Sequence, residues 1–173
     1  MTPKVCCLIV AIGLLSCSGE PQFSTIPAKH NYELAVPEFL SPTEALSAVA
    51  DLQYMSAFRE FYLMVTEESK AKRDAVNSNS DFGLQEYTEY TKNNFESLLQ
   101  EAKASPYKSV DLKGTPGIYF TLSGKLKEHE VFYTCAVAES DTHFYQIIIW
   151  TKQKNQEKYK ETIDKVLGSF KVK

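Results

Sequence analysis

The sequence predicts an α+β domain, in which an antiparallel β-sheet has helices packed on its faces. Residues 131–137 and 144–150 are apolar at consecutive positions, which is expected of central strands covered on both sides. Only a short polar segment joins them, so they should be neighbours in a meander. Residues 84–102 and 159–170 carry apolar residues at intervals of three and four, the pattern of amphipathic helices that cover a sheet.

The first elements of the chain are short. Residues 32–36 alternate between apolar and polar types and stop at Pro37, which predicts a strand at a sheet edge. Residues 41–50 are ambiguous, and a short helix could begin there with Ser41 as its cap and Pro42 in its first turn.

Two further strands are predicted at residues 52–58 and 61–66. Arg59 and Glu60 either form a tight turn between them or continue one long strand. Residues 67–81 are polar and poor in aromatic residues, which predicts a helical turn that runs into a mobile surface loop.

The second half is rich in predicted strands. Asp81 stands where a cap would precede the helix of residues 84–102, and Ser105-Pro106 ends that helix. Residues 109–112 and 118–122 are predicted strands that lead into the two central ones. The helix at residues 159–170 closes the chain.

The N-terminus has the order of a secretory signal. A lysine, Lys4, precedes the apolar run of residues 5–15, and small residues follow. About 11 apolar residues span roughly 16 Å as a helix, well short of the ~30 Å hydrocarbon core, so a permanent transmembrane helix is not expected. Leu14-Leu15-Ser16-Cys17 resembles the lipobox of bacterial lipoproteins, which implies cleavage before Cys17 and attachment of lipid to its sulfur.

This resemblance divides the chain into three parts. Residues 1–16 are a lipoprotein signal peptide, residues 17–30 are the lipidated cysteine and a tether, and residues 31–173 are a single domain. The lipid implies a protein bound to a membrane of the bacterial cell envelope. Ser18, in place of aspartate, favours the outer membrane with the domain facing the periplasm under the enterobacterial sorting pattern.

Composition excludes some classes of partner. Without residues 1–16 the chain has 18 basic and 22 acidic side chains, a net charge of −4, and no basic run. Nucleic acid is therefore not expected as a partner, nor is a second, electrostatic contact with a membrane. Cys6 and Cys7 leave with the signal and Cys17 carries lipid, so Cys135 has no cysteine with which to form an intrachain disulfide.

Three stretches of the sequence resemble the Mog1/PsbP-like superfamily. They are the aromatic strand of residues 144–150, the closing Ser169-Phe170-Lys171, and the entry to the meander at residues 114–119. The resemblance covers residues 31–173 and implies an α/β/α sandwich. Known members, a photosystem oxygen-evolving subunit and a regulator of a nuclear-transport GTPase, are binding or assembly modules, so it also implies a noncatalytic role. No binding residue is carried over.

Catalytic and metal-binding patterns are weak in this sequence. His30 lies in the tether, and His129 and His143 stand apart near predicted turns. Around His129, Lys127-Glu128-His129-Glu130 offers carboxylates, but alternation along a strand would split them between two faces, so no metal is expected. Cys135 is in the middle of a strand, where an inert buried thiol is usual. With seven glycines and no phosphate-loop or nucleophile-elbow motif, neither a cofactor nor an enzyme activity is expected.

Two binding hypotheses remain. The preferred one is a noncatalytic envelope module that binds a protein partner, with residues 67–81 as its contact surface. The alternative is a lipoprotein that binds a small ligand or glycan in an aromatic groove. The candidate groove residues are Tyr87, Tyr90, Tyr119, Tyr133, Tyr145 and Trp150, which could equally be packing residues of the core.

Overall fold

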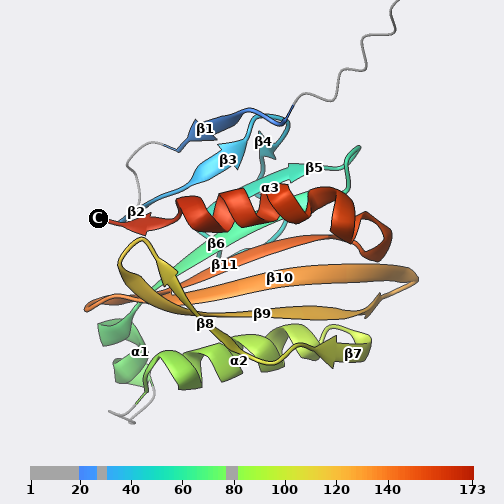
Figure 1. Cartoon of the computed structure of the whole chain (residues 1–173). Coiled ribbons are helices and arrows are strands. Elements are labelled where there is room, and N and C mark those ends of the chain that lie inside the picture. Colours follow the sequence, from blue (N-terminus) through green and yellow to red (C-terminus); the bar gives the residue numbers. More distant parts are fainter. Residues whose placement is uncertain (1–19, 27–30, 77–81) are drawn as a thin grey trace, which may run out of the picture.

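The computed structural model describes residues 20–26, 31–76 and 82–173, and its centre is one large antiparallel sheet. The sheet order is β4-β5-β6-β11-β10-β9-β7, with β8 also paired to β9 (Figure 1). The strands are β4 (Ser41–Pro42), β5 (Leu52–Ser56), β6 (Phe61–Ser69), β7 (Gln100–Ala104), β8 (Lys108–Leu112), β9 (Thr115–Leu126), β10 (His129–Glu139) and β11 (His143–Lys152). The predicted α+β class with an antiparallel sheet is confirmed.

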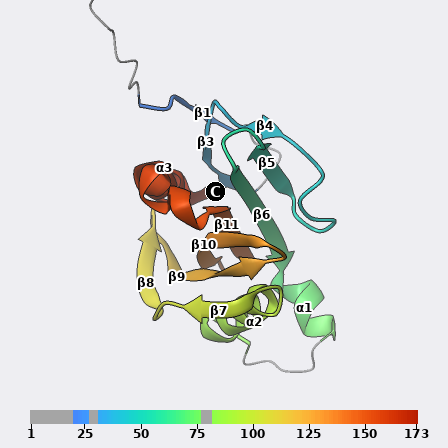
Figure 2. The same cartoon turned by 90° about the vertical axis from the view of Figure 1, so that its right-hand side faces the viewer.

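Helices cover both faces of the sheet. The helix α3 (Gln156–Ser169), preceded by a 3-10 turn at Gln153–Asn155, lies on one face. The opposite face carries α2 (Leu84–Glu96), with the shorter α1 (Lys70–Val76) beside one end of it (Figures 1 and 2). In the described part of the chain no helix has the length and apolar character needed to cross a bilayer.

The central strands bury side chains on both faces, which explains their consecutive apolar residues. Ile147 and Ile149 of β11 enter the core under α3, whereas Ile148 between them enters the core under α2. Cys135 of β10 is opposite Ile148 and lies in the same α2 core. All four side chains are fully shielded from solvent.

Arg59 and Glu60 form a tight turn between two strands. The Glu60 amide donates to the carbonyl of Ala57 at 3.2 Å, and Glu60 adopts a left-handed backbone conformation with φ of 54°. Of the two alternatives left open by the sequence, the hairpin of β5 and β6 is therefore the correct one.

The helix predicted at residues 84–102 is too long. α2 ends at Glu96, and β7 (Gln100–Ala104) pairs with β9 at the sheet edge. Leu98 is 57% exposed and Ala102 is also exposed, so their helical spacing buries nothing. Without β7, backbone amides and carbonyls along that edge of β9 would have no hydrogen-bond partner. Pairing of β7 with β9 therefore outweighs the helical spacing of apolar residues in the sequence.

The early segments agree with the predictions only in part. Residues 41–50 form no helix, because the side-chain oxygen of Gln53 accepts from the amides of Leu46 and Ser47, each at 2.9 Å, and holds that segment as a loop. Residues 32–36 were expected to form one strand at a sheet edge, and they form parts of two short strands outside the large sheet. β2 (Tyr32–Glu33) pairs with β12 (Lys171–Val172), and β3 (Ala35–Pro37) pairs with β1 (Phe23–Thr25).

The segment expected to be a free tether is partly folded. β1 (Phe23–Thr25) lies within it, and the Glu20 carboxylate accepts from the Lys165 ammonium of α3 at 2.7 Å. That hydrogen bond lowers the pKa of Glu20. Residues 27–30, including His30, lie outside the described residues, but among the described ones the contacts with the domain start at Glu20 and not at residue 31.

Candidate functional site

The six aromatic residues proposed for a groove do not share a surface. They divide between the two faces of the sheet: Tyr119 and Tyr145 pack in the α3 core, whereas Tyr87, Tyr133 and Trp150 pack in the α2 core. Tyr90 is on α2 and 44% exposed. The rings contact one another, as in the stacking of Tyr133 on Trp150 at 5.6 Å between centroids. The groove expected from the sequence is not assembled.

The segment proposed as a contact surface has three parts. Residues 67–69 complete β6, residues 70–76 form α1 as the predicted helical turn, and residues 77–81 lie outside the described part of the chain. Asp81, the predicted cap of α2, falls among the latter. Side chains on both sides of this gap converge on one arginine.

Arg73 of α1 is held inside a cage of aromatic rings. Its guanidinium lies 4.1 Å from the ring centroid of Phe82, 4.4 Å from that of Tyr90 and 4.8 Å from that of Tyr87. Its Nη1 donates to both carboxylate oxygens of Glu68 at 3.0 Å. We call Arg73, these three rings and Glu68 the Arg73 cage. Because the side chain is only 7% exposed, the cage fastens α1 to the start of α2.

The cage continues into the sheet through hydrogen bonds. The Tyr87 hydroxyl donates to Glu68 at 2.8 Å and accepts from the Gln146 amide of β11 at 2.9 Å. Burial, followed by the hydrogen bond to Glu68, raises the pKa of Tyr87. The phenol therefore remains neutral, and its role is to join the carboxylate to the sheet rather than to act as a base.

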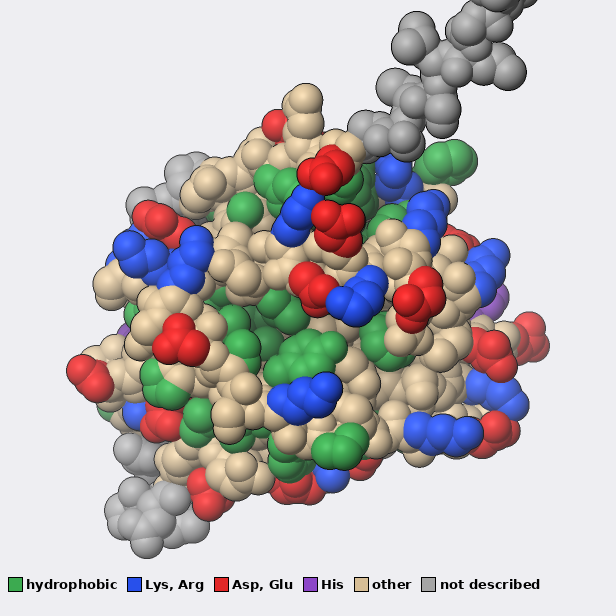
Figure 3. Space-filling view, viewed as in Figure 1, with side chains coloured by type: hydrophobic (Ala, Val, Ile, Leu, Met, Phe, Trp, Pro, Cys, Tyr) green, Lys and Arg blue, Asp and Glu red, His purple; other side chains and the backbone are tan. Residues whose placement is uncertain are grey.

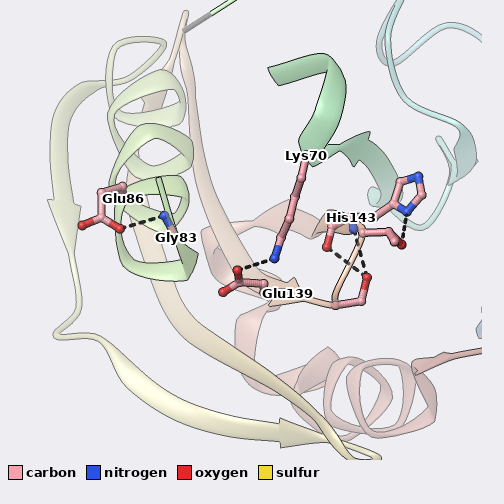
Figure 4. A network of polar contacts seen from close by, with 7 residues as sticks. Lys70, Gly83, Glu86, Glu139 and His143 are labelled. Carbon is pink, nitrogen blue, oxygen red and sulfur yellow. Dashed lines mark hydrogen bonds and ion pairs between the residues drawn. The ribbon is translucent and has the colours of Figure 1, made fainter. Parts of the chain in front are cut away.

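A second polar network lies beside the cage (Figure 4). The Lys70 ammonium donates to Glu139 at 2.6 Å, which ties the start of α1 to the end of β10. The turn into β11 is closed by the His143 amide, which donates to the Ser140 hydroxyl at 3.0 Å. At the start of α2, where Gly83 is the N-cap residue, the Glu86 carboxylate accepts from the amide of Gly83 at 3.1 Å.

These contacts define one end of the molecule. We call the combination of α1, the first turns of α2 and the β10–β11 turn the distal end. In Figures 1 and 2 it lies at the bottom, while the described chain begins at the top beside β1. The start of the described chain and the distal end therefore lie at opposite ends of the molecule.

The predicted structural role of Cys135 fits its surroundings. Its thiol is fully buried, and burial raises the pKa of that thiol, so the reactive thiolate is disfavoured at neutral pH.

The histidines considered as metal ligands lie apart from one another. The His143 ring lies 3.6 Å from the Glu67 carboxylate at the distal end, whereas His129 is exposed at the start of β10. Glu128, His129 and Glu130 border one shallow hollow together with three lysines, Lys125, Lys152 and Lys154. Among the described residues no group of three ligands could hold a metal ion.

A large open hollow of about 830 Å³ lies beside β4 and β5. Thr43, Glu44 and Asp51 supply its polar rim, and Ile26 and Leu52 supply apolar surface. We call it the β4–β5 hollow. Gln53, which fixes the loop of residues 46–50, also borders it, so its wall is built by internal hydrogen bonds.

Sequence reasoning missed Arg73, Glu68 and Phe82. One signal was available: the chain has 17 lysines and only two arginines, Arg59 and Arg73. Arginine differs from lysine in its planar, stacking guanidinium. Both arginines do lie on aromatic rings, since the guanidinium of Arg59 is 4.7 Å from the ring centroid of Phe39.

Comparison with known proteins identifies the fold. No family model and no curated protein matches the sequence. Cyanobacterial PsbP (CyanoP) of Synechocystis superposes with a TM-score of 0.59 at 18% identity, covering 94% of this chain and 99% of that one. LpqN of Mycobacterium tuberculosis, described as involved in cell envelope biogenesis, also gives 0.59, at 9% identity over 89% of this chain and 92% of its own.

A third similar structure is a protein of unknown function from Pseudomonas aeruginosa, with a TM-score of 0.53 and 10% identity over 85% of this chain and 94% of that one. Identities this low establish the shared fold and not a shared function. The chain has a PsbP-like fold.

Proposed function

We propose that this protein is a lipid-anchored module of the bacterial cell envelope, without catalytic activity, that binds a protein partner through its distal end. Cys17 carries the lipid, and Ser18 favours the outer membrane with the domain in the periplasm. The similarity to LpqN, itself described as an envelope-biogenesis protein, supports this assignment by analogy of fold.

The observation that carries the proposal is that the distal end and the entry of the chain lie on opposite sides of the molecule. The chain enters the fold at Glu20, and the distal end lies on the other side of the molecule (Figures 1 and 2). An anchor at Cys17 therefore holds the entry side at the bilayer and presents the distal end to the surrounding compartment. The Arg73 cage makes this end rigid, and Tyr90 exposes 44% of its surface there. A preorganised surface with an exposed aromatic residue is typical of protein interfaces.

Site-specific photocrosslinking in intact cells tests this function. A benzoylphenylalanine at position 90 of the lipidated protein should give a discrete adduct with a partner. The same amino acid at Val49, which is 76% exposed in the β4–β5 loop, is the matched control and should not give that adduct. Cys17→Ala should abolish the adduct by releasing the protein from the membrane. No adduct at position 90, or an identical one from position 49, would refute the assignment of the distal end.

The β4–β5 hollow favours a second candidate, the binding of a small ligand or glycan. It combines carboxylates with an apolar wall and one aromatic residue, Tyr54, instead of the six expected from the sequence. Saturation-transfer NMR with short glycans should then show binding that Tyr54→Ala weakens. If no transfer is observed, this candidate is eliminated.

A further inference from the structure

The tip of the β5–β6 hairpin exposes an aromatic ring to solvent. Phe58 is 97% exposed, more than any other large hydrophobic residue in the described part of the chain. A fully exposed phenylalanine contributes nothing to the core and disfavours solubility, so its position calls for an apolar environment outside the domain.

The tip is a built structure and not a loose loop. The Tyr159 hydroxyl of α3 donates to the carbonyl of Arg59 at 2.9 Å, and the Thr151 hydroxyl of β11 donates to the carbonyl of Glu60 at 2.7 Å. The Arg59 guanidinium rests on the ring of Phe39, 4.7 Å from its centroid. Three contacts with other elements thus fix the residues that follow Phe58, and the ring is held in its exposed position.

This tip lies beside the point where the chain enters the fold. Pro21 and Gln22 border the same hollow, of about 370 Å³, as Arg59 and Lys158. Pro21 is the fourth residue after Cys17, and this stretch of chain spans at most about 14 Å even when fully extended. In Figure 3 a projecting hydrophobic side chain and basic side chains lie at the upper right of the molecule, next to the start of the grey trace, and acidic side chains lie near them.

We infer that Phe58 inserts into the interfacial region of the bilayer, as a second membrane contact beside the lipid. This inference rests on the anchor at Cys17 in the proposed function. A lipid within about 14 Å of Pro21 brings the hairpin tip to the depth of the headgroups, where an aromatic side chain is favoured.

The contact is mainly apolar. Arg59 and Lys158 face the headgroup phosphates, but Glu38 borders the same hollow and the net charge of residues 17–173 is −4. Electrostatic attraction alone would therefore not bind this side to a membrane. Two attachment points, Cys17 and Phe58, fix the orientation of the domain and direct the distal end away from the lipid.

Fluorescence quenching in a reconstituted membrane tests the inference. The full lipidated chain with Phe58→Trp is placed in vesicles of phosphatidylethanolamine and phosphatidylglycerol that carry brominated acyl chains. The emission of the introduced indole, after subtraction of the wild-type signal from Trp150, should shift to the blue and be largely quenched. Leu98→Trp is the matched control, because Leu98 is 57% exposed after α2 on the far side, and it should show neither effect.

The outcomes separate this inference from the anchor. Flotation of the vesicles with the protein but no quenching at position 58 would overturn the inference and leave the anchor intact. Failure of wild type to float, or equal flotation of Cys17→Ala, would refute the anchor and with it the inference. A blue shift without quenching by bromine would indicate contact of the tip with a second copy of this chain, and would overturn the membrane contact. Phe58→Ser should leave the urea midpoint unchanged, which excludes a role in folding.

Discussion

Replacing Arg73 with methionine removes the charge at the centre of the distal end and keeps an unbranched apolar side chain. Wild-type Arg73 is 7% exposed, binds Glu68 at 3.0 Å and stacks on three rings at 4.1 to 4.8 Å. The substitution leaves the Glu68 carboxylate without its strongest partner, although the Tyr87 hydroxyl still donates to it.

The expected loss of stability follows from these contacts. Removing one partner of a fully buried ion pair costs about 3 to 5 kcal/mol, because the remaining charge stays unpaired. The Glu68 side chain is 32% exposed. Hydration of that carboxylate should reduce the cost to about 1 to 2 kcal/mol, and the lost cation–π contacts add about 1 kcal/mol. We expect a total of about 2 to 3 kcal/mol, or a fall in Tm of about 4 to 12 °C for a domain of this size.

Urea unfolding followed by circular dichroism measures this loss. Glu68→Gln and the double variant complete a mutant cycle, and a coupling of about 1 to 2 kcal/mol between Arg73 and Glu68 is expected. Lys72→Met, on the exposed side of α1, is the control and should change stability by less than about 0.5 kcal/mol. If Arg73→Met costs no more than this control, or if the two variants of the pair are additive, the Arg73 cage does not stabilise the distal end.

Three other perturbations have clear expected outcomes. In urea unfolding, Gly117→Ala should destabilise the protein by about 1 to 3 kcal/mol, because a Cβ at Gly117 would lie 2.8 Å from the carbonyl oxygen of Val137. Gly168→Ala in α3 should instead stabilise it by about 0.5 to 1 kcal/mol, because the added Cβ meets no atom within 4 Å. Burial raises the pKa of Tyr133 to about 12 and also raises that of Tyr87. The unfolded state therefore releases these protons at a lower pH than the folded state, and the urea midpoint should be constant up to about pH 10 and fall above it. A thiol reagent should detect no free thiol in the native, membrane-bound protein. In denaturant it should detect one, that of Cys135, and detection of a second thiol would contradict lipidation of Cys17.

The centre of the sheet could be predicted because its chemistry is local. Residues 131–137 and 144–150 fall within β10 and β11, and their apolar residues at consecutive positions allow little else than strands buried on both faces. α3 was equally accessible, since its buried residues keep one helical stripe. For these elements the local pattern and the tertiary contacts favour the same structure.

The edges of the fold could not be predicted in this way, because partners distant in sequence determine them. β7 is exposed at every position, and only its pairing with β9 makes it a strand. β1 has three residues, and its pairing with β3 together with the Glu20–Lys165 contact replaces the tether that its prolines and polar residues suggested. A short strand of this kind has no periodicity from which it could be recognised.

The Arg73 cage was invisible for a different reason. Residues 67–81 are polar in composition, and the sequence of this segment does not distinguish a buried arginine from an exposed one. The rings that bury it come from Phe82, Tyr87 and Tyr90, beyond the polar segment. The rarity of arginine was the informative property of the sequence. The chain uses lysine for nearly all its positive charge, and at both positions where it uses arginine the planar guanidinium stacks on an aromatic ring.

Those two arginines bear on how the domain can be held at a membrane. Arg73 stiffens the distal end, and Arg59 fixes the hairpin tip beside the entry of the chain. A free tether of residues 18–30 would have let either end approach the lipid. Since β1 and the Glu20–Lys165 contact leave only Ser18 and Gly19 between Cys17 and the fold, an anchor at Cys17 acts on the side of Arg59 alone. The orientation of the domain would then follow from its own packing, without help from a partner.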